Sequence, residues 1–184
     1  MAKQTSEARV RLQHAAVELF QEHGFDRTTA AEIAARAGVT ERTFFRHFTD
    51  KREVLFDGQA VLTDALTAAI ASAPAGSRPL DTLFHAFRSV TQLLEGNRSF
   101  AEPRQKVISA APALQERELA KLEALSGALA HALKARAVPD LNAILAARAG
   151  VAAFAHATIS WLESEKPGLA ERLDLAERAL KAVL

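Results

Sequence analysis

Residues 37–51 read AGVTERTFFRHFTDK and place three of the ten phenylalanines of the chain within five positions. At about 100° per residue, Phe44 and Phe48 fall on the same side of a helix. Arg42 and Arg46 lie together on another side, well away from these two rings. The pattern predicts a short helix that buries two aromatic side chains against a small core and holds two arginines outward.

The residues before this helix carry the signals for another short helix and a tight turn. Thr29 and Glu32 have the spacing of a capping box, in which the side chain of each accepts a hydrogen bond from the backbone amide of the other. Gly38 can end that helix, and the hydroxyl of Thr40 can cap the next one after a turn of about three residues. This is the layout of a helix-turn-helix, whose second helix, here about residues 40–47, enters the major groove of DNA.

The composition is that of an ordinary globular protein. The 184 residues are 49% apolar and 24% charged, and 23 basic side chains against 22 acidic ones leave a net charge of +1. Any basic surface must therefore be local. The absence of cysteine excludes disulfides and thiolate chemistry. No segment has the pattern of a signal peptide or the length of a membrane span, so we expect a cytoplasmic protein with no membrane partner.

Helical periodicity runs through the whole sequence. Alanine and leucine dominate, and valine and isoleucine never alternate over the length of a strand, so we expect an all-α fold of about nine helices. Leu55, Leu62 and Leu66 indicate a long fourth helix. Further helices are expected at residues 6–23, from Leu80 to Leu94, between Pro103 and Pro112, and at about residues 113–136, 140–164 and 168–184.

Two domains are expected. The segment Ala73–Pro79 is the clearest break in the helical pattern, and we place the change of domain before it. Residues 1–56 would form a helix-turn-helix DNA-binding domain. Residues 57–184 would form a larger helical domain for regulation, ligand binding and dimerisation.

The N-terminal region resembles the TetR family of transcriptional repressors, in a match that covers about residues 9–56. The residues that carry the resemblance are Ala15-Ala16, Leu19-Phe20, Gly24-Phe25, Thr28-Thr29, Glu32-Ile33-Ala34, Ala37-Gly38-Val39-Thr40, Thr43-Phe44-Phe45, His47-Phe48 and Lys51. Beyond this region the chain is similar to the family only in its length and its helical pattern.

The resemblance implies a set of DNA contacts. The residues expected to hold phosphates are Thr28, Thr40, Thr43, His47 and Lys51. Those expected to face bases are Glu41, Arg42, Phe45 and Arg46. Phe45 stands where the family often has a phosphate-binding tyrosine, so an apolar contact is expected there, and Arg42 stands where the family often has a small residue. The alternative is that the two arginines form a solvated face of a helix pair that never meets DNA.

The C-terminal region has two stripes that could form a dimer interface. Small residues recur in one late helix, and apolar residues line one side of the last helix at similar spacing. The interface residues expected from these stripes are Ala146, Gly150, Ala153, Ala157, Leu169, Leu173 and Leu180. The alternative is that the stripes pack within one subunit.

A ligand pocket is a second expectation for this region, because its helices are rich in aromatic and aliphatic side chains. The pocket residues expected are Phe84, Phe87, Val90, Phe100, Val107, Leu125, Arg148 and Phe154. Most such residues could equally be core, and Arg148 could bind a ligand carboxylate or form a structural ion pair. The histidines are not clustered with carboxylates, so we expect no metal site, and no cofactor.

Together these features predict a homodimeric repressor of a palindromic operator in double-stranded DNA, released by a small apolar or amphipathic effector. Two recognition helices about 34 to 36 Å apart would meet successive major grooves. We expect the fourth helix to transmit the signal, because Leu55 would join it to the DNA-reading unit. An enzyme is not expected, since the sequence has no catalytic motif. The remaining alternative is a helical carrier or sensor of small molecules that binds no operator.

Overall fold

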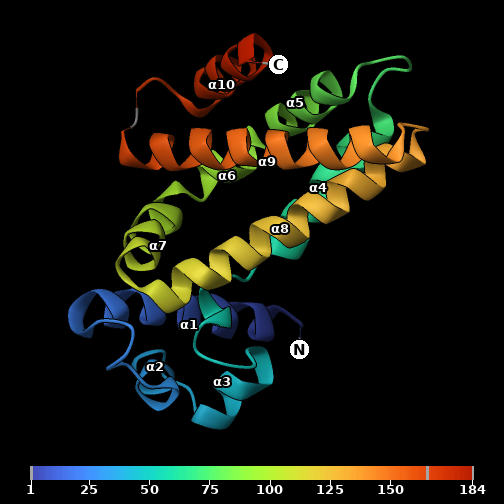
Figure 1. The fold of residues 1–184 in the computed structure, drawn as a ribbon. Helices are drawn as coiled ribbons and strands as arrows, with labels where there is room; N and C mark the ends of the chain where they lie inside the picture. The colour runs from blue at the N-terminus through green and yellow to red at the C-terminus, as the bar shows by residue number, and fades with distance from the viewer. Residues whose placement is uncertain (1, 165, 184) are drawn as a thin grey trace. The chain divides into compact units, whose positions relative to one another are not determined.

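The computed structural model describes residues 2–164 and 166–183, which form helices joined by turns and loops and include no strand (Figure 1). This confirms the all-α prediction. The helices are α1 (Ala2–His23), α2 (Ala30–Arg36), α3 (Glu41–His47), the 3-10 turn η1 (Glu53–Leu55), α4 (Gln59–Ser72), α5 (Pro79–Ser89), α6 (Thr91–Gly96), α7 (Arg98–Ala110), α8 (Pro112–Ala135), α9 (Asp140–Glu163) and α10 (Leu169–Val183).

The chain forms two compact units that do not follow a single cut in the sequence. The first unit runs to Asp57 and also contains Ser99–Glu118. The second consists of Gly58–Arg98 and the chain from Leu119 onward. The predicted division at residue 56 assigns α7 and the start of α8 to the second domain, whereas in the structure they belong to the first unit.

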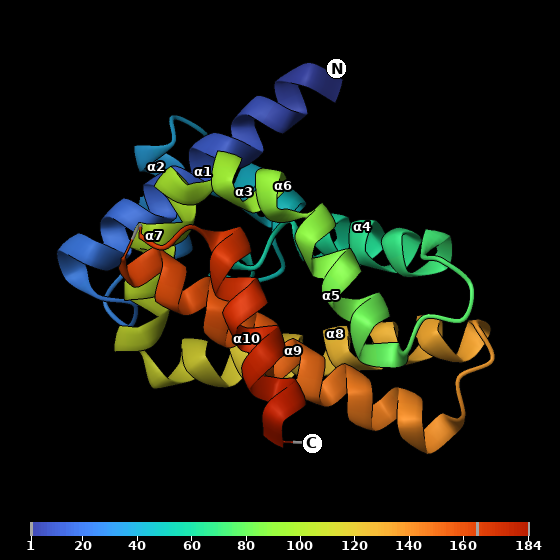
Figure 2. The ribbon, with the colours of Figure 1, turned by 90° about the horizontal axis from the view of Figure 1, so that it is seen from above.

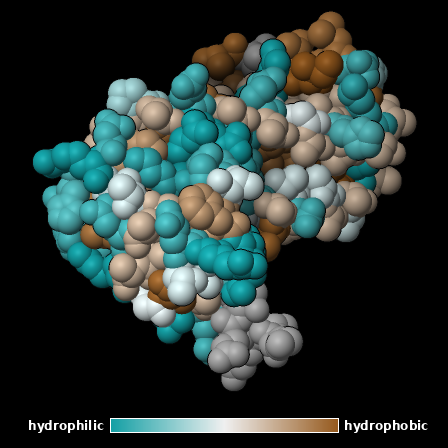
Figure 3. All heavy atoms as spheres, turned by 90° about the horizontal axis from the view of Figure 1, so that it is seen from below, coloured by the Kyte–Doolittle hydropathy of each residue, from teal (hydrophilic) through white to brown (hydrophobic). Residues whose placement is uncertain are grey.

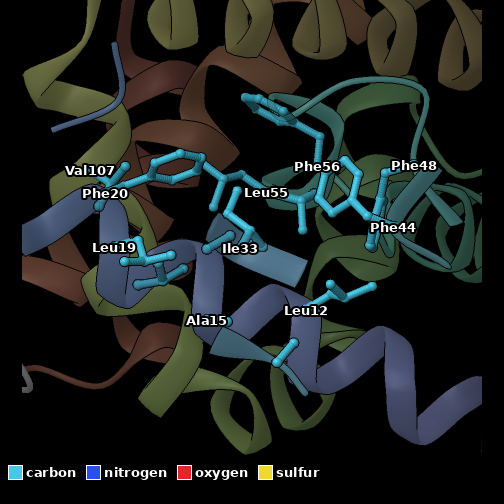
Figure 4. Packing of buried hydrophobic residues seen from close by; sticks show 14 of the residues in the cluster. Leu12, Ala15, Leu19, Phe20, Ile33, Phe44, Phe48, Leu55, Phe56 and Val107 are labelled. Carbon is cyan, nitrogen blue, oxygen red and sulfur yellow. The ribbon is translucent and has the colours of Figure 1, made fainter. Parts of the chain in front are cut away.

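The first unit has its own hydrophobic core, to which α1, α2, α3, η1, α7 and the start of α8 all contribute (Figure 4). Leu12, Ile33 and Phe44 are completely buried in it. Ile108 from α7 and Leu114 from α8 are completely buried as well. A unit made of α1, α2 and α3 alone would have little apolar surface to bury, and the later helices enlarge its core.

The predicted fourth helix is wrong in its first part, because the chain turns before α4 begins. Asp50 Oδ1 accepts hydrogen bonds from the amides of Arg52 at 2.7 Å and Glu53 at 3.1 Å, which fixes the 3-10 turn. Gly58 then takes a left-handed conformation with φ of 89°, which favours glycine. Leu55 therefore lies in the core of the first unit and not on α4, so the prediction that this helix packs on the first unit through Leu55 is wrong.

Two other helix boundaries differ from the prediction. The helix expected from Leu80 to Leu94 is divided at Val90, whose ψ of 2° interrupts the helical path between α5 and α6. Pro103, expected to bound a helix, lies inside α7. Proline removes one backbone donor there but still fits helical φ. A proline in the sequence therefore does not by itself mark the end of a helix.

In the second unit, α5, α9 and α10 pack against one another (Figure 2). The rings of Phe87 and Phe154 stack with centroids 4.6 Å apart. Arg88 on α5 forms ion pairs with Asp174 and Glu177 on α10. Leu169 and Leu173 form the inward side of α10, where they are completely buried.

Four of the seven residues predicted to form the dimer interface lie in this interior and not on the surface. Gly150 is buried against α5, where an added Cβ would lie 3.0 Å from Leu83 Cδ1. Ala157, Leu169 and Leu173 are 1%, 0% and 0% exposed. The remaining stripe residues are only partly buried: Ala146, Ala153 and Leu180. The prediction is therefore wrong for the four buried residues, which pack within one subunit.

The close approach at Gly150 leads to a stability prediction. Replacing Gly150 with valine is expected to destabilise the second unit by about 1 to 3 kcal/mol, because the new side chain overlaps buried Leu83. Gly127→Val is the control, since a Cβ at Gly127 on α8 meets nothing within 4 Å. Unfolding in urea, followed by the fluorescence of Trp161, measures both. Equal effects of the two substitutions would contradict the packing argument.

The helix α9 is the one helix, among the described residues, that is long and apolar enough to cross a membrane. Only 33% of its most apolar stretch is buried in the structure. In this fold α9 packs against α5 and α10, as a core helix of the second unit does. The rest of its apolar surface is left uncovered within one subunit.

Candidate nucleic-acid interface

The helix-turn-helix is built from local hydrogen bonds that the sequence predicts. Thr29 Oγ1 accepts from the amide of Glu32 at 3.2 Å, and Glu32 Oε2 accepts from the amide of Thr29 at 2.8 Å. Gly38 has φ of 68° and lies in the turn. Thr40 Oγ1 then accepts from the amide of Thr43 at 3.2 Å and caps α3. Both predicted caps are confirmed.

Two phenylalanines anchor α3 as predicted. Phe44 and Phe48 are 0% and 4% exposed, and their ring centroids are 5.6 Å apart. Phe48 is not part of the helix but follows it in an extended conformation, with its amide donating to the carbonyl of Phe44 at 2.9 Å. The two rings occupy the inward side of the helix and so fix which side faces outward.

The outward side of α3 is formed by residues expected to face bases. Glu41, Arg42, Phe45 and Arg46 are all exposed. Arg42 and Arg46 make no hydrogen bond or ion pair within residues 2–164 and 166–183, so their guanidinium groups are available to a ligand. Figure 3 views the molecule from below Figure 1 and shows hydrophilic atoms over much of this face, with hydrophobic ones gathered mainly at its upper edge.

The two threonines at the start of α3 lie next to each other. Thr40 and Thr43 have their hydroxyl oxygens 3.1 Å apart, and Thr40 is exposed. A hydroxyl engaged in one hydrogen bond can still form another with a phosphate oxygen. The positions of these two hydroxyl groups therefore allow the predicted contacts with phosphate.

His47 is half-buried at the end of α3. Its Nε2 atom is buried and has no hydrogen-bond partner in the described part of the chain. Burial lowers the pKa of His47, and the positive charges of Arg46 and Arg9 lower it further. The lowered pKa favours the neutral form of the imidazole. A phosphate contact of the neutral side chain, as the resemblance implies, would be weaker than a charged contact.

Thr28 and Lys51, also expected to hold phosphates, make hydrogen bonds within the first unit. Thr28 is 1% exposed, and its hydroxyl donates to the carbonyl of Gly24 at 2.9 Å. Lys51 Nζ donates to the carbonyls of Phe25 at 2.7 Å, Asp26 at 3.3 Å and Thr28 at 2.9 Å. All three ammonium hydrogens are thus used to hold the loop between α1 and α2.

Further side chains support the interface without any signal in the local sequence. Arg104 on α7 donates to the carbonyl of Leu55, and Arg117 on α8 pairs with Glu53. These bonds attach the later helices to η1, which follows the reading helix. Arg104 is 49 residues from Leu55 along the chain, and Arg117 is 64 residues from Glu53, so helical spacing could not have predicted either contact.

The predicted pocket residues come together only in part. Val107 belongs to the core of the first unit, and Phe100 packs against that core. Arg148 is exposed and pairs with Glu123 at 2.6 Å, which makes it a surface ion pair. The others lie in the second unit, where they are almost completely buried: Phe84, Phe87, Val90, Leu125 and Phe154. The prediction is wrong for Phe100, Val107 and Arg148.

One open hollow lies on the first unit, on the surface of α1 and α2. It has a volume of about 280 Å³ and includes Val10, His14 and the ion-paired Glu18 and Arg36 among its lining residues. It is unrelated to the predicted pocket. The described residues contain no group of three or more histidines, aspartates or glutamates that could hold a metal ion.

Two family models match most of the chain. The model described as "Bacterial regulatory proteins, tetR family" matches residues 12–57, and the "MftR C-terminal domain" matches residues 77–184. The first match contains α2, the turn and α3, and the second extends from the start of α5 to the end of the chain.

Similar proteins agree with these matches. The HTH-type transcriptional regulator TcmR of Streptomyces glaucescens is 34% identical over 145 residues, which are 76% of this chain and 64% of that protein. This chain thus spans slightly less than two thirds of that relative's length.

Solved structures have the same fold. The complex of SmeT with triclosan has a TM-score of 0.67 at 22% identity and covers 96% of this chain and 90% of its own. Thermus thermophilus FadR, a TetR-family repressor in complex with lauroyl-CoA, has a TM-score of 0.56 at 28% identity, covering 94% of this chain and 93% of its own.

Proposed function

Since this chain belongs to the TetR family of bacterial regulatory proteins, we propose that it is a homodimeric, ligand-responsive repressor that binds a palindromic operator through α3. The observation that carries the proposal is the outward side of α3, where Arg42 and Arg46 are exposed and have no partner in the described part of the chain. Arginine is the side chain that most often reads guanine in the major groove.

The proposed dimer uses exposed apolar residues of α9 and α10 rather than the buried stripes. Leu141 and Leu145 on α9 are 65% and 58% exposed, and Leu175 on α10 is 48% exposed. At helical spacing, Leu141, Leu145 and exposed Ala152 share one side of α9. A second copy that covers this side would bury apolar surface that one subunit leaves in water. The dimer would also present two copies of α3 to one operator.

The proposed effector is small and apolar or amphipathic. SmeT was solved with triclosan and Thermus thermophilus FadR with lauroyl-CoA, and both have the same fold as this chain. In the second unit, the rings of Phe84, Phe87 and Phe154 pack together in the interior, and an apolar site for such a molecule would open among them. We place the effector site in this unit.

Release of DNA would follow from linkage between the effector and the operator. The helix α7 begins at Arg98 in the second unit and continues into the first, where Arg104 donates to Leu55 of η1. This helix therefore replaces α4 as the proposed path of the signal. A coupling of about 1 to 3 kcal/mol would change operator affinity roughly 5- to 150-fold.

Selection of bound duplexes from a random DNA pool tests the proposal directly. A repressor of the proposed kind enriches a palindrome whose half-sites are about one helical turn, or a multiple of it, apart. A carrier of small molecules with no operator would enrich no sequence. The second result would remove the proposed function.

Arg42→Ala is expected to weaken binding to the selected site by about 1 to 3 kcal/mol for each half-site and to relax the preference at one base pair. The reason is the loss of hydrogen bonds to a base edge. Arg78→Ala is the control, because Arg78 is exposed in the second unit and far along the chain from α3. Fluorescence anisotropy with the selected duplex and with single-base variants measures both effects. An equal loss on every sequence would show that Arg42 contacts phosphate instead.

A further inference from the structure

The outward side of α3 carries one apolar ring among charged side chains. With about 100° between successive residues, Phe45 falls between Glu41 and Arg42 around the helix. Phe45 is 52% exposed. The ring therefore lies within the outward side of α3.

The position of this ring is fixed by the core beneath it. The ring of Phe44, which is completely buried, meets the ring of Phe45 at 5.3 Å between centroids and at 83°. Phe45 cannot turn inward, because Phe44 and Phe48 already fill that side of the helix. About half of an apolar side chain thus stays in water, which is unfavourable unless a partner covers it.

The major groove offers one apolar group on its base edges. The other base edges in that groove present hydrogen-bond donors and acceptors and the small C5–H of cytosine, whereas thymine carries a methyl group at C5. A phenyl ring has no hydrogen-bond donor or acceptor, so it cannot pair with the polar groups on the base edges. The methyl group is therefore the feature of the groove that matches Phe45.

We infer that Phe45 reads the 5-methyl group of a pyrimidine in each operator half-site and so specifies thymine at one position. The inference rests on the proposed function and adds to it the base that one residue selects. Arg42 is next to Phe45 on the outward side, so the thymine lies close to the base that Arg42 contacts. The same methyl group occurs in 5-methylcytosine, which the experiment below separates from thymine.

Replacing thymine by deoxyuridine tests the inference, because the replacement removes a single methyl group. The full chain selects its site from a random duplex pool, and each thymine of that site is then replaced in turn by deoxyuridine, which differs only in lacking the methyl. We expect one position in each half-site to weaken binding by about 4-fold for each methyl removed. At that position, a pair of 5-methylcytosine with guanine should bind more tightly than unmodified cytosine with guanine by a similar factor, although thymine remains the preferred base.

Variants of the protein connect the methyl effect to Phe45. Phe45→Ala should bind the thymine and deoxyuridine sites equally, and Phe45→Leu, which keeps an apolar side chain, should retain part of the difference. Leu119→Ala is the matched control, since Leu119 is an exposed apolar residue of α8 with 67% exposure, and it should keep the full difference. Circular dichroism establishes that each variant is folded, and Phe45→Leu keeps the test decisive if Phe45→Ala is not.

The possible results separate this inference from the proposed function. A selected site that contains no thymine, or whose affinity ignores every methyl, overturns the inference and leaves the repressor proposal standing. A methyl effect of equal size in the wild type and in Phe45→Ala also overturns it, because another residue then reads the base. A pool from which no sequence is enriched overturns both.

Discussion

Replacing Leu145 with glutamate is expected to convert the dimer into a monomer and to weaken operator binding at least about 100-fold. Leu145 is 58% exposed on the side of α9 that we assign to the dimer. In a two-fold interface each substitution occurs twice, so two carboxylates would be moved from water into an apolar contact. A monomer holds only one α3, and it loses the gain in affinity from binding two half-sites together.

Leu119→Glu is the matched control for this substitution. Leu119 has a similar exposure, 67%, but lies on α8, outside the proposed interface. Sedimentation and light scattering give the mass of each variant, and anisotropy with the selected operator gives its affinity. A Leu145→Glu protein that remains dimeric would show that α9 does not form the interface through this side.

The first unit could be predicted from the sequence because its decisive interactions are local. The bonds between Thr29 and Glu32, and between Thr40 and Thr43, connect residues three positions apart. The burial of Phe44 follows from helical spacing in the same way. Chemistry of this kind is visible in a short stretch of sequence and needs no knowledge of the tertiary structure.

The dimer surface could not be predicted in this way, because α9 is apolar around much of its circumference. Spacing correctly grouped Gly150 with Ala157, but it could not say whether that side meets a second subunit or α5 of the same subunit. The exposed leucines at 141 and 145 lie on another side of the same helix. Periodicity identifies which residues share a side, and tertiary packing decides which side is covered.

The predicted pocket failed for a related reason. Phe100 and Val107 lie on α7, which carries the chain back to the first unit. No composition change or break marks this return, since α7 has the pattern of one more amphipathic helix. Arg148 was singled out as a charge on an apolar helix, and the structure pairs it with Glu123 on α8, 25 residues away.

Replacing Lys51 with methionine is expected to destabilise the first unit by about 3 to 4 kcal/mol. The ammonium group donates to three carbonyls of the loop between α1 and α2 and lies 4.3 Å from the centre of the Phe25 ring. Methionine keeps the apolar part of the side chain but leaves these carbonyls without their donor. The loop positions α2 on α1, so its loosening should affect the whole helix-turn-helix.

Lys106→Met is the control for Lys51→Met. Lys106 also lies in the first unit and is 69% exposed, with an ion pair to Glu102 on the same helix, and an exposed pair of this kind contributes little to stability. Hydrogen exchange of the amides of α1 and α2 measures the first unit, while the fluorescence of Trp161 follows the second. We expect Lys51→Met to increase exchange in the first unit only.

The same variant decides between the two roles of Lys51. If the side chain held a phosphate, as the family resemblance implies, Lys51→Met would leave exchange unchanged and would reduce the slope of log affinity against log salt by about 0.9 for each phosphate that is no longer neutralised. If it holds the loop, exchange rises and the slope of the folded protein stays the same. A lysine whose three donors already bind carbonyls would have to break those bonds to reach DNA, and this is why we expect the second result.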